Sequence, residues 1–268
     1  MFNSNKRLII LDADGTTIDA YQAIGKAFAL HGMALGDQER FQKRRHLFKY
    51  FGGLREFPAN LKKQITRRRR RQLISTLTDV YREEAQLYPG MAAMIQTLID
   101  APNIVVGLMT RNITNEPLET LRQLFRRHEI DVDALDFLVH IPLSQNKTAH
   151  FQAARFGNNI NPARAYICGD EFKDYQAALE SGMHPFMVSY GFEDFGRLTK
   201  KFNVPNALIS RTPQELCGRM LHALDLANVV SIEQHIQIRA EDTFPEMSAV
   251  ALHNIAARSS LFARRTDG

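Results

Sequence analysis

The sequence predicts an α/β fold built on a parallel sheet, and three observations support this fold class. The run from Leu8 to Leu11 is apolar without alternation, which is typical of a strand that is buried on both faces of a sheet. After residue 90, short apolar runs alternate with segments of helical period, which is the pattern of βαβ units. The chain has 268 residues, enough for one core domain and a smaller second unit.

The predicted elements follow in chain order. We expect strands over residues 7–14, 104–109, 137–141, 165–168, 186–189 and 207–209. We expect a mostly helical segment over residues 20–88, with a long helix over 61–84, and then helices over residues 91–99, 116–127, 148–156, 175–180 and 247–257. Inside the helical segment, Phe51 to Pro58 is predicted to be a loop because it contains two glycines and a proline. Pro89 and Gly90 end the segment.

Charge is unevenly distributed along the chain, whose net charge is +5. Residues 20–88 hold 15 Lys and Arg against 6 Asp and Glu, a net charge of +9, whereas the other residues hold 19 against 23, a net charge of −4. Such asymmetry indicates two units with different roles. We therefore predict a core domain from residues 1–19 and 89–225, an inserted helical domain over 20–88, and a C-terminal extension of open role over 226–268.

Composition favours a cytoplasmic protein. No apolar run approaches the ~20 residues that span a bilayer, and the chain reaches its first strand too early for a signal peptide. Cys168 and Cys217 are the only cysteines, so we expect a reducing compartment, no disulfide framework and no zinc site. We expect no membrane partner, and a monomer and a homodimer both stay open.

The run Arg67 to Arg71 invites a nucleic-acid hypothesis. Five consecutive helical residues point around the whole cylinder and cannot form one stripe. No interleaved aromatic residues offer surfaces for base stacking. We therefore expect no nucleic-acid partner. Two explanations of the arginine run stay open: a solvated helix face, and the attraction of anionic substrates or partners.

Four polar sites fall at the ends of predicted strands or in the loops just beyond them. They are Asp12 with Asp14, Thr110, Lys147, and Asp170 with Asp174. Open α/β sheets bind their ligands at the carboxyl ends of the strands, so we expect these side chains to converge. Phosphoryl transfer through a covalent aspartate requires an attacking carboxylate, an acid for the leaving oxygen, polar groups on the other oxygens and a metal. The set therefore predicts phosphoryl transfer.

The same residues resemble the motifs of the haloacid dehalogenase superfamily in its phosphatase form. Leu11 to Asp19 resembles the first motif, Val105 to Asn112 the second, Lys147 the third, and Gly169 to Asp174 the fourth. The resemblance covers about residues 6–217 and is strongest to phosphoglycolate phosphatase-like members. It implies a Rossmann-like core of three α/β/α layers with an inserted α-helical cap of the C1 type.

Carried onto this sequence, the resemblance implies a role for each motif residue. Asp12 would be the nucleophile, Asp14 the general acid and then base, and Thr110 and Lys147 would bind phosphoryl oxygens. The metal residues would be Asp12, Asp14 through its backbone carbonyl, Asp170 and Asp174, the last orienting metal-bound water or Lys147. Mg²⁺ suits these oxygen ligands. The substrate-binding residues would be Thr16, Arg55, Arg111 and Asn112.

Motif spacing places the cap. Asp14 and Thr110 are 96 positions apart, but Thr110 and Lys147 only 37, so the insertion follows the first motif. In the family, such an insertion implies a helical cap that closes over a small-molecule site. The loop Gly52 to Arg55 would face the pocket, and Arg55 would meet a second anionic group on a small phosphorylated metabolite.

Two departures from the family pattern leave alternatives open. Lys147 is followed by Thr148 where relatives carry Pro, so Lys173 is a competing cation. Arg111 follows Thr110 where many relatives have Asn or Gly, and it would then contact phosphate itself. Asp14 argues against a dehalogenase, because halide leaves without a proton.

These observations predict a Mg²⁺-dependent phosphatase. It would hydrolyse a small phosphomonoester, such as phosphoglycolate, a sugar phosphate or a nucleotide, through an aspartyl-phosphate. The alternatives are a phosphomutase of the same superfamily and a non-catalytic binding or regulatory protein that acts through the basic cap.

Overall fold

The computed structural model describes residue 2, residues 5–33 and residues 67–227. The strands in this part of the chain are β1 (Arg7–Asp12), β2 (Ile104–Thr110), β3 (Phe137–His140), β4 (Ala165–Gly169), β5 (His184–Val188) and β6 (Ile209–Ser210). The α-helices are α1 (Ala20–Leu30), α5 (Arg67–Glu83), α6 (Met91–Asp100), α7 (Pro117–Arg127), α8 (Lys147–Gly157), α9 (Phe172–Glu180) and α10 (Pro213–Ala223).

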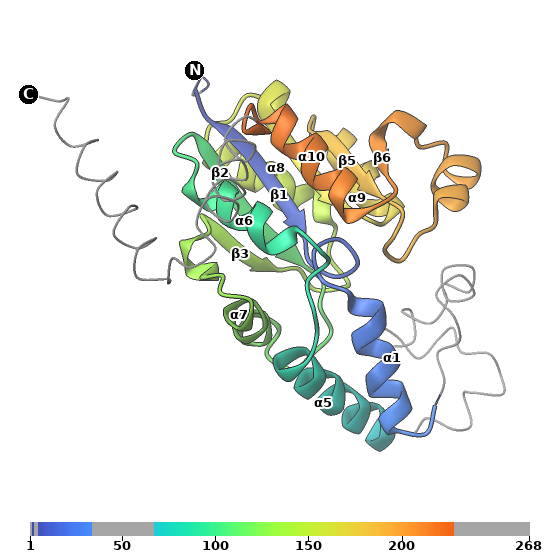
Figure 1. Ribbon diagram of the computed structural model, residues 1–268. Coiled ribbons are helices and arrows are strands. Elements are labelled where there is room, and N and C mark those ends of the chain that lie inside the picture. Colours follow the sequence, from blue (N-terminus) through green and yellow to red (C-terminus); the bar gives the residue numbers. More distant parts are fainter. Residues whose placement is uncertain (1, 3–4, 34–66, 228–268) are drawn as a thin grey trace, which may run out of the picture. The chain divides into compact units, whose positions relative to one another are not determined.

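The strands form one six-stranded sheet in the order β3-β2-β1-β4-β5-β6 (Figure 1). Every neighbouring pair is parallel, with Leu8 opposite Val105 on one side and Ala165 on the other. The predicted α/β fold with a parallel sheet is therefore confirmed. The chain winds outward from β1 in one direction to β3 and then returns to build β4 to β6, so the strand order reverses between β1 and β4. Open α/β sheets bind ligands at this reversal.

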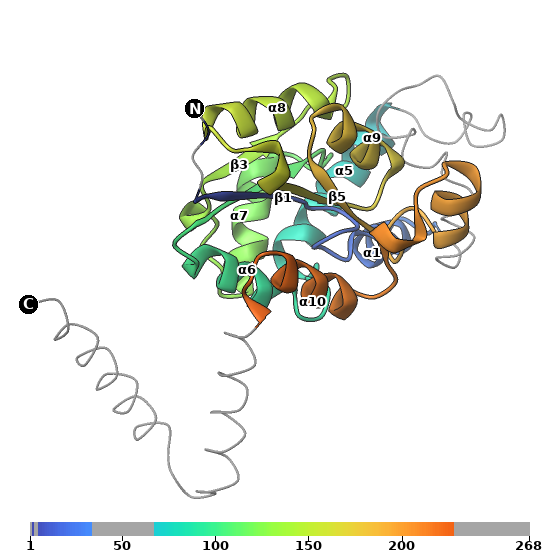
Figure 2. The ribbon, with the colours of Figure 1, turned by 90° about the horizontal axis from the view of Figure 1, so that it is seen from above.

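β1 lies in the middle of the sheet because both of its faces are apolar. Leu8, Ile9, Ile10 and Leu11 are fully buried. Leu8 and Ile10 belong to a core cluster on one face, together with side chains of β2, β4, α8, α9 and the loops that follow β3, α8 and α9: Val105, Met109, Ile141, Phe151, Ile160, Ala165, Ile167, Ala177, Ala178 and Met183. Figure 2 shows α8 and α9 over one face of the sheet and α6 with the start of α10 over the other. This arrangement gives the three layers that the sequence predicted.

Helix starts agree with local capping chemistry. The Asp19 carboxylate accepts a hydrogen bond from Gln22 N at 3.0 Å before α1, and the Asn146 side chain accepts one from Thr148 N at 3.1 Å before α8. α9 begins at Phe172, three residues earlier than predicted, because Glu171 and Asp174 form a capping box at its start.

The helix α10 was not predicted, although its sequence carries a start signal. Pro213 occupies its first turn, and the Thr212 hydroxyl accepts a hydrogen bond from Glu215 N at 3.1 Å. Ala207 and Leu208, which were expected in a strand, form a short helical turn that leaves only Ile209 and Ser210 in β6.

The long helix α5 contacts both α1 and α7 (Figure 1). Lys26 of α1 forms an ion pair with Glu84, just after α5. The Arg82 guanidinium contacts Glu116 Oε2 at 2.9 Å and Thr120 Oγ1 at 3.2 Å, at the start of α7. Polar contacts therefore hold the end of α5 against the helix that follows β2.

The chain divides into two compact units, the first over Met1–Met220 and the second from Leu221 onward. The sheet, α1 and α5 all belong to the first unit. The boundary of the inserted cap at residues 20–88 stays a prediction. The loop predicted over 51–58, the first residues of the helix over 61–84, and the helix over 247–257 lie outside the described residues. Within the described ranges, no helix combines the length and apolarity that crossing a membrane requires.

Candidate active site

The site begins where β1 ends. Asp12 is the last residue of β1 and is only 6% exposed. The chain then turns back, with Gly15 N donating to Ile18 O at 3.0 Å and Ile18 N donating to Ala13 O at 2.9 Å. Gly15 has φ +82°, and a Cβ atom there would lie 2.3 Å from Asp170 Oδ2. This glycine therefore satisfies both a left-handed backbone and a close approach to a site carboxylate.

Lys147 lies between two buried carboxylates. Its ammonium donates to Asp12 Oδ1 at 2.9 Å and also to Asp174 Oδ1. Burial alone would lower the pKa of Lys147, but the charges of Asp12 and Asp174 outweigh it and raise the pKa. Lys147 thus stays cationic. Of the two lysines considered from the sequence, Lys147 is buried in the site and Lys173 is exposed.

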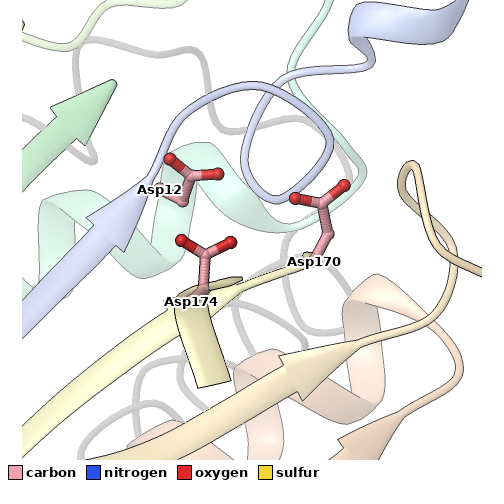
Figure 3. Close-up of side chains that lie close together, drawn as sticks. All are labelled: Asp12, Asp170 and Asp174. Atoms are coloured by element: carbon pink, nitrogen blue, oxygen red, sulfur yellow. The ribbon is translucent and has the colours of Figure 1, made fainter. Parts of the chain in front are cut away.

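Three carboxylates gather at this end of the sheet, from β1, the end of β4 and the first turn of α9 (Figure 3). One oxygen from each of Asp12, Asp170 and Asp174 lies within 4.8 Å of the other two. Burial raises the pKa of Asp12 to about 8, with Lys147 opposing the shift and Asp174 adding to it. Burial also raises the pKa of Asp170 well above its ordinary range, and Asp12 adds to that shift. Clustered acids of this kind are stabilised by a cation.

The oxygens of the cluster show which carboxylates fit a metal. Asp170 Oδ2 accepts a hydrogen bond from Phe192 N at 2.6 Å, whereas its Oδ1 is buried with no hydrogen-bond partner among the described residues. Both oxygens of Asp174 are engaged, one by Lys147 and the other by Glu171 N at 3.1 Å. The buried unpaired oxygen of Asp170 fits a hard divalent cation such as Mg²⁺. Asp174 is better placed to hold Lys147 than to bind metal directly.

Three described residues donate hydrogen bonds to Asp14, one from α5 and two from the end of β2 and the loop after it. Its Oδ1 accepts from the Tyr81 hydroxyl at 2.7 Å and from Asn112 Nδ2 at 3.1 Å. Its Oδ2 accepts from Asn112 Nδ2 at 3.2 Å and from the Thr110 hydroxyl at 3.3 Å. Burial raises the pKa of Asp14, and the hydrogen bonds from Tyr81, Asn112 and Thr110 work against that shift.

The loop after β2 is itself ordered by hydrogen bonds. Thr110 Oγ1 accepts from Asn112 N at 2.9 Å, and Asn112 Oδ1 accepts from Thr114 N at 2.9 Å. His140 contacts the Asn112 carbonyl at 3.0 Å. These contacts fix Thr110 and Asn112 beside Asp14.

The remaining predicted substrate residues are placed differently. Arg111 donates to the Gln145 carbonyl, and its Nε is buried without a hydrogen-bond partner among the described residues. Thr16 is fully buried, and its hydroxyl also lacks a partner in the same part of the structure. Arg55 lies outside the described residues.

Two tyrosines near the carboxylates were not predicted as site residues. Tyr81 belongs to α5 and lies within the helix predicted over residues 61–84. Tyr88 has a buried hydroxyl with no hydrogen-bond partner among the described residues. Its ring packs edge-on against the ring of Tyr190, with the two ring centroids 4.7 Å apart. Helical spacing identifies such residues as core and gives no signal that a hydroxyl reaches a carboxylate far away in the chain.

The structure therefore brings the polar residues of four strand ends and loops to one edge of the sheet. They are Asp12, Asp14, Thr110, Asn112, Lys147, Asp170 and Asp174. A buried carboxylate beside a cation, a second carboxylate with hydroxyl and amide donors, and an unpaired metal-type oxygen are suited to transfer of an anionic group.

Comparison with known proteins gives one family. The model of the haloacid dehalogenase-like hydrolase family matches residues 9–188, which contain all of these polar residues. A search of curated protein sequences gives no significant match.

Solved structures agree with the fold. A haloacid dehalogenase-like family hydrolase from Streptococcus pneumoniae superposes with a TM-score of 0.55 at 18% identity, covering 81% of this chain and 99% of that one. A protein assigned as a phosphoglycolate phosphatase from Lactobacillus delbrueckii subsp. bulgaricus superposes with a TM-score of 0.52 at 17% identity, covering 82% of this chain and 98% of that one. A protein assigned as a β-phosphoglucomutase from Thermotoga maritima superposes with a TM-score of 0.56 at 16% identity, covering 81% of this chain and 99% of that one.

Proposed function

Because the chain belongs to the haloacid dehalogenase-like hydrolase family, we propose that it is a Mg²⁺-dependent phosphatase that acts on a small phosphomonoester. The observation that carries the proposal is the pairing of two different carboxylates at the end of β1. Asp12 is buried beside the Lys147 ammonium, whereas Asp14 is held by hydroxyl and amide donors. Different environments for two neighbouring acids are suited to different roles.

In the first step, an Asp12 carboxylate oxygen attacks phosphorus and the bond from phosphorus to the leaving oxygen breaks. Asp14 enters this step protonated and gives its proton to the leaving oxygen, so the alcohol departs neutral. The raised pKa of Asp14 favours that protonated form. Thr110 and Lys147, which donate to Asp14 and Asp12, would donate to the phosphoryl oxygens as charge redistributes over them.

In the second step, Asp14, now a carboxylate, takes a proton from water as the water oxygen attacks phosphorus. The bond between phosphorus and the Asp12 oxygen breaks, inorganic phosphate leaves, and Asp12 returns to a carboxylate. The hydrogen bonds from Tyr81 and Asn112 hold Asp14 in place before substrate binds.

Asp12 and Asp170 are the side chains that would hold Mg²⁺, with the backbone carbonyl of Asp14. The buried, unpaired Asp170 Oδ1 supports this ligand set. When bound, Mg²⁺ would supply charge neutralisation for the clustered carboxylates and for the phosphoryl group. Lys147 provides part of the same neutralisation through its hydrogen bond to Asp12.

The test is hydrolysis of para-nitrophenyl phosphate with Mg²⁺ and with EDTA, by the wild type and by Asp12→Asn. We expect Mg²⁺-dependent turnover that the substitution abolishes. Asp100→Asn is the matched control, because Asp100 is exposed at the end of α6. Equal turnover by the wild type and Asp12→Asn would contradict the proposal.

The substrate is sought next among small phosphate esters. Phosphoglycolate and sugar phosphates come first in the panel, because two of the structural relatives carry names of enzymes that act on such compounds. Product analysis separates hydrolysis from its alternative: a mutase returns an isomeric phosphate ester, whereas a phosphatase releases inorganic phosphate. A non-catalytic binding protein would retain its cellular role in the Asp12→Asn variant.

A further inference from the structure

Among the described residues, the shortest hydrogen bond to Asp14 comes from α5, outside the four motifs. The Tyr81 hydroxyl donates to Asp14 Oδ1 at 2.7 Å, whereas the bonds from Asn112 and Thr110 measure 3.1 to 3.3 Å. The Tyr81 side chain is only 2% exposed, so water does not compete freely for its hydroxyl. A phenol keeps its proton at neutral pH and is therefore a constant donor.

The other two donors to Asp14 have a second task in the proposed reaction. Thr110 and Asn112 lie where the phosphoryl group is expected to bind, so their donors are drawn toward its oxygens when substrate enters. Tyr81 has no such task. Of the three, it is the partner that can keep its bond to Asp14 through both steps.

Contacts between α5 and α7 fix the position of Tyr81. The Arg127 guanidinium donates to the Arg82 carbonyl at 2.8 Å and to the carbonyls of Tyr81 and Ala85. Arg82 in turn contacts Glu116 at the start of α7. The last turn of α5 is thus bound at several points to α7, the helix that follows β2. The hydroxyl of Tyr81 is therefore held in a fixed place relative to Thr110 and Asn112.

From this geometry we propose that Tyr81 is a positioning residue that fixes the Asp14 carboxyl group for proton transfer. Tyr81 occupies Oδ1, which leaves Oδ2 as the oxygen that gives the proton to the leaving group and later takes one from water. The inference rests on the proposed phosphatase function and adds to it: the inserted segment supplies a side chain to the acid–base machinery.

The test compares Tyr81→Phe with the wild type on phosphate esters of different leaving groups. para-Nitrophenolate departs readily without a proton, whereas the alkoxide of glycerol phosphate requires one. We expect kcat/KM on glycerol phosphate to fall about 10- to 100-fold, as for partial loss of general acid catalysis, and to fall much less on para-nitrophenyl phosphate. The ratio kcat/KM reports the first chemical step, so a slow second step does not hide the difference.

Tyr166→Phe is the matched control, because Tyr166 of β4 packs its ring against His184 and Phe186. The Tyr166→Phe substitution should leave kcat/KM unchanged for both substrates. A second comparison uses Asp14→Asn as background. If Tyr81 acts through Asp14, adding Tyr81→Phe to Asp14→Asn should change kcat/KM by less than twofold.

The outcomes separate this inference from its premise. An equal fall on both substrates, no fall on either, or an additive loss in the double variant would overturn the role of Tyr81, even with the wild type and Asp12→Asn behaving as proposed. Full activity of Asp12→Asn would overturn the phosphatase proposal, and the role of Tyr81 with it. Equal thermal unfolding midpoints for Tyr81→Phe and the wild type would show that the fold is intact.

Discussion

The ammonium of Lys147 lies 2.9 Å from the Asp12 carboxylate, although the two residues are 135 positions apart. Asp12 ends β1, and Lys147 starts α8, which leads into β4 beside β1. The parallel sheet therefore brings the first and third motifs together. Because both groups are buried, their contact is important for stability as well as for chemistry.

Replacing Lys147 by Met should destabilise the protein. The substitution leaves Asp174 buried without its cation and Asp12 without its hydrogen-bond donor, and breaking a buried ion pair in this way costs about 3–5 kcal/mol. The free energy of unfolding in urea, measured with EDTA present, would show the loss. Lys173→Met is the control, since Lys173 is exposed and should change stability little. Equal stability of the two variants would argue against the buried ion pair.

Magnesium should stabilise the wild type through Asp170. At about one hundred times its dissociation constant, a ligand that binds only the folded state contributes about 2.7 kcal/mol. The thermal unfolding midpoint should therefore rise with Mg²⁺ for the wild type and rise much less for Asp170→Asn, which loses an anionic oxygen ligand. Asp100→Asn is again the control. If Mg²⁺ raised the thermal unfolding midpoint of Asp170→Asn as much as that of Asp100→Asn, Asp170 would not be a ligand of the metal.

Without metal, Asp12 should make the protein less stable as pH rises. Burial raises the folded-state pKa of Asp12 from its ordinary value of 3.8 to about 8. Between these values the unfolded chain has lost the proton that the folded protein keeps, so folding becomes less favourable with increasing pH. In EDTA, the stability of the wild type relative to Asp12→Asn should fall between pH 5 and pH 8. Saturating Mg²⁺ should remove this trend. Urea unfolding at several pH values measures this trend. Parallel curves of unfolding free energy against pH for the wild type and Asp12→Asn in EDTA would refute the prediction.

Gly169→Ala should destabilise the junction of β4 and α9. A Cβ atom at this position would lie 2.4 Å from the Asp174 Cβ, so the strand and helix must separate. Overpacking of this kind costs about 1–3 kcal/mol, and activity should fall because Asp174 moves away from Lys147. Gly157→Ala is the matched control, because nothing lies within 4 Å of its added Cβ atom. Urea unfolding and hydrolysis of para-nitrophenyl phosphate check both effects, and a Gly169→Ala protein as stable and active as Gly157→Ala would contradict the packing argument.

The sequence predicts the fold well because its signals are local. Strand β1 is an uninterrupted apolar run, and the paired acids follow it directly, so Asp12 and Asp14 could be found without knowing the rest of the fold. Asp170 could be found in the same way at the end of β4.

The contributions that were missed depend on contacts distant in sequence. Tyr81 reaches Asp14 across 67 positions, and helical spacing alone identifies it as a core residue. The sequence assigns the third motif to Lys147, but its distinction from Lys173 depends on burial, which neighbouring residues in the sequence do not reveal. The unpaired oxygen of Asp170 likewise follows from the position of Phe192 N, which occupies the other oxygen.

The central claim is that Asp12 accepts the phosphoryl group, and mass spectrometry tests it most directly. The Asp14→Asn variant, which should be slow to activate water, is incubated with para-nitrophenyl phosphate and Mg²⁺, quenched in acid and digested. We predict one added phosphoryl group on the peptide that contains Asp12, removed by hydroxylamine as expected for an acyl phosphate and absent when Asp12 is also replaced by Asn. A phosphoryl group on another residue, or an unmodified Asp12 together with full turnover by Asp12→Asn, would contradict the account.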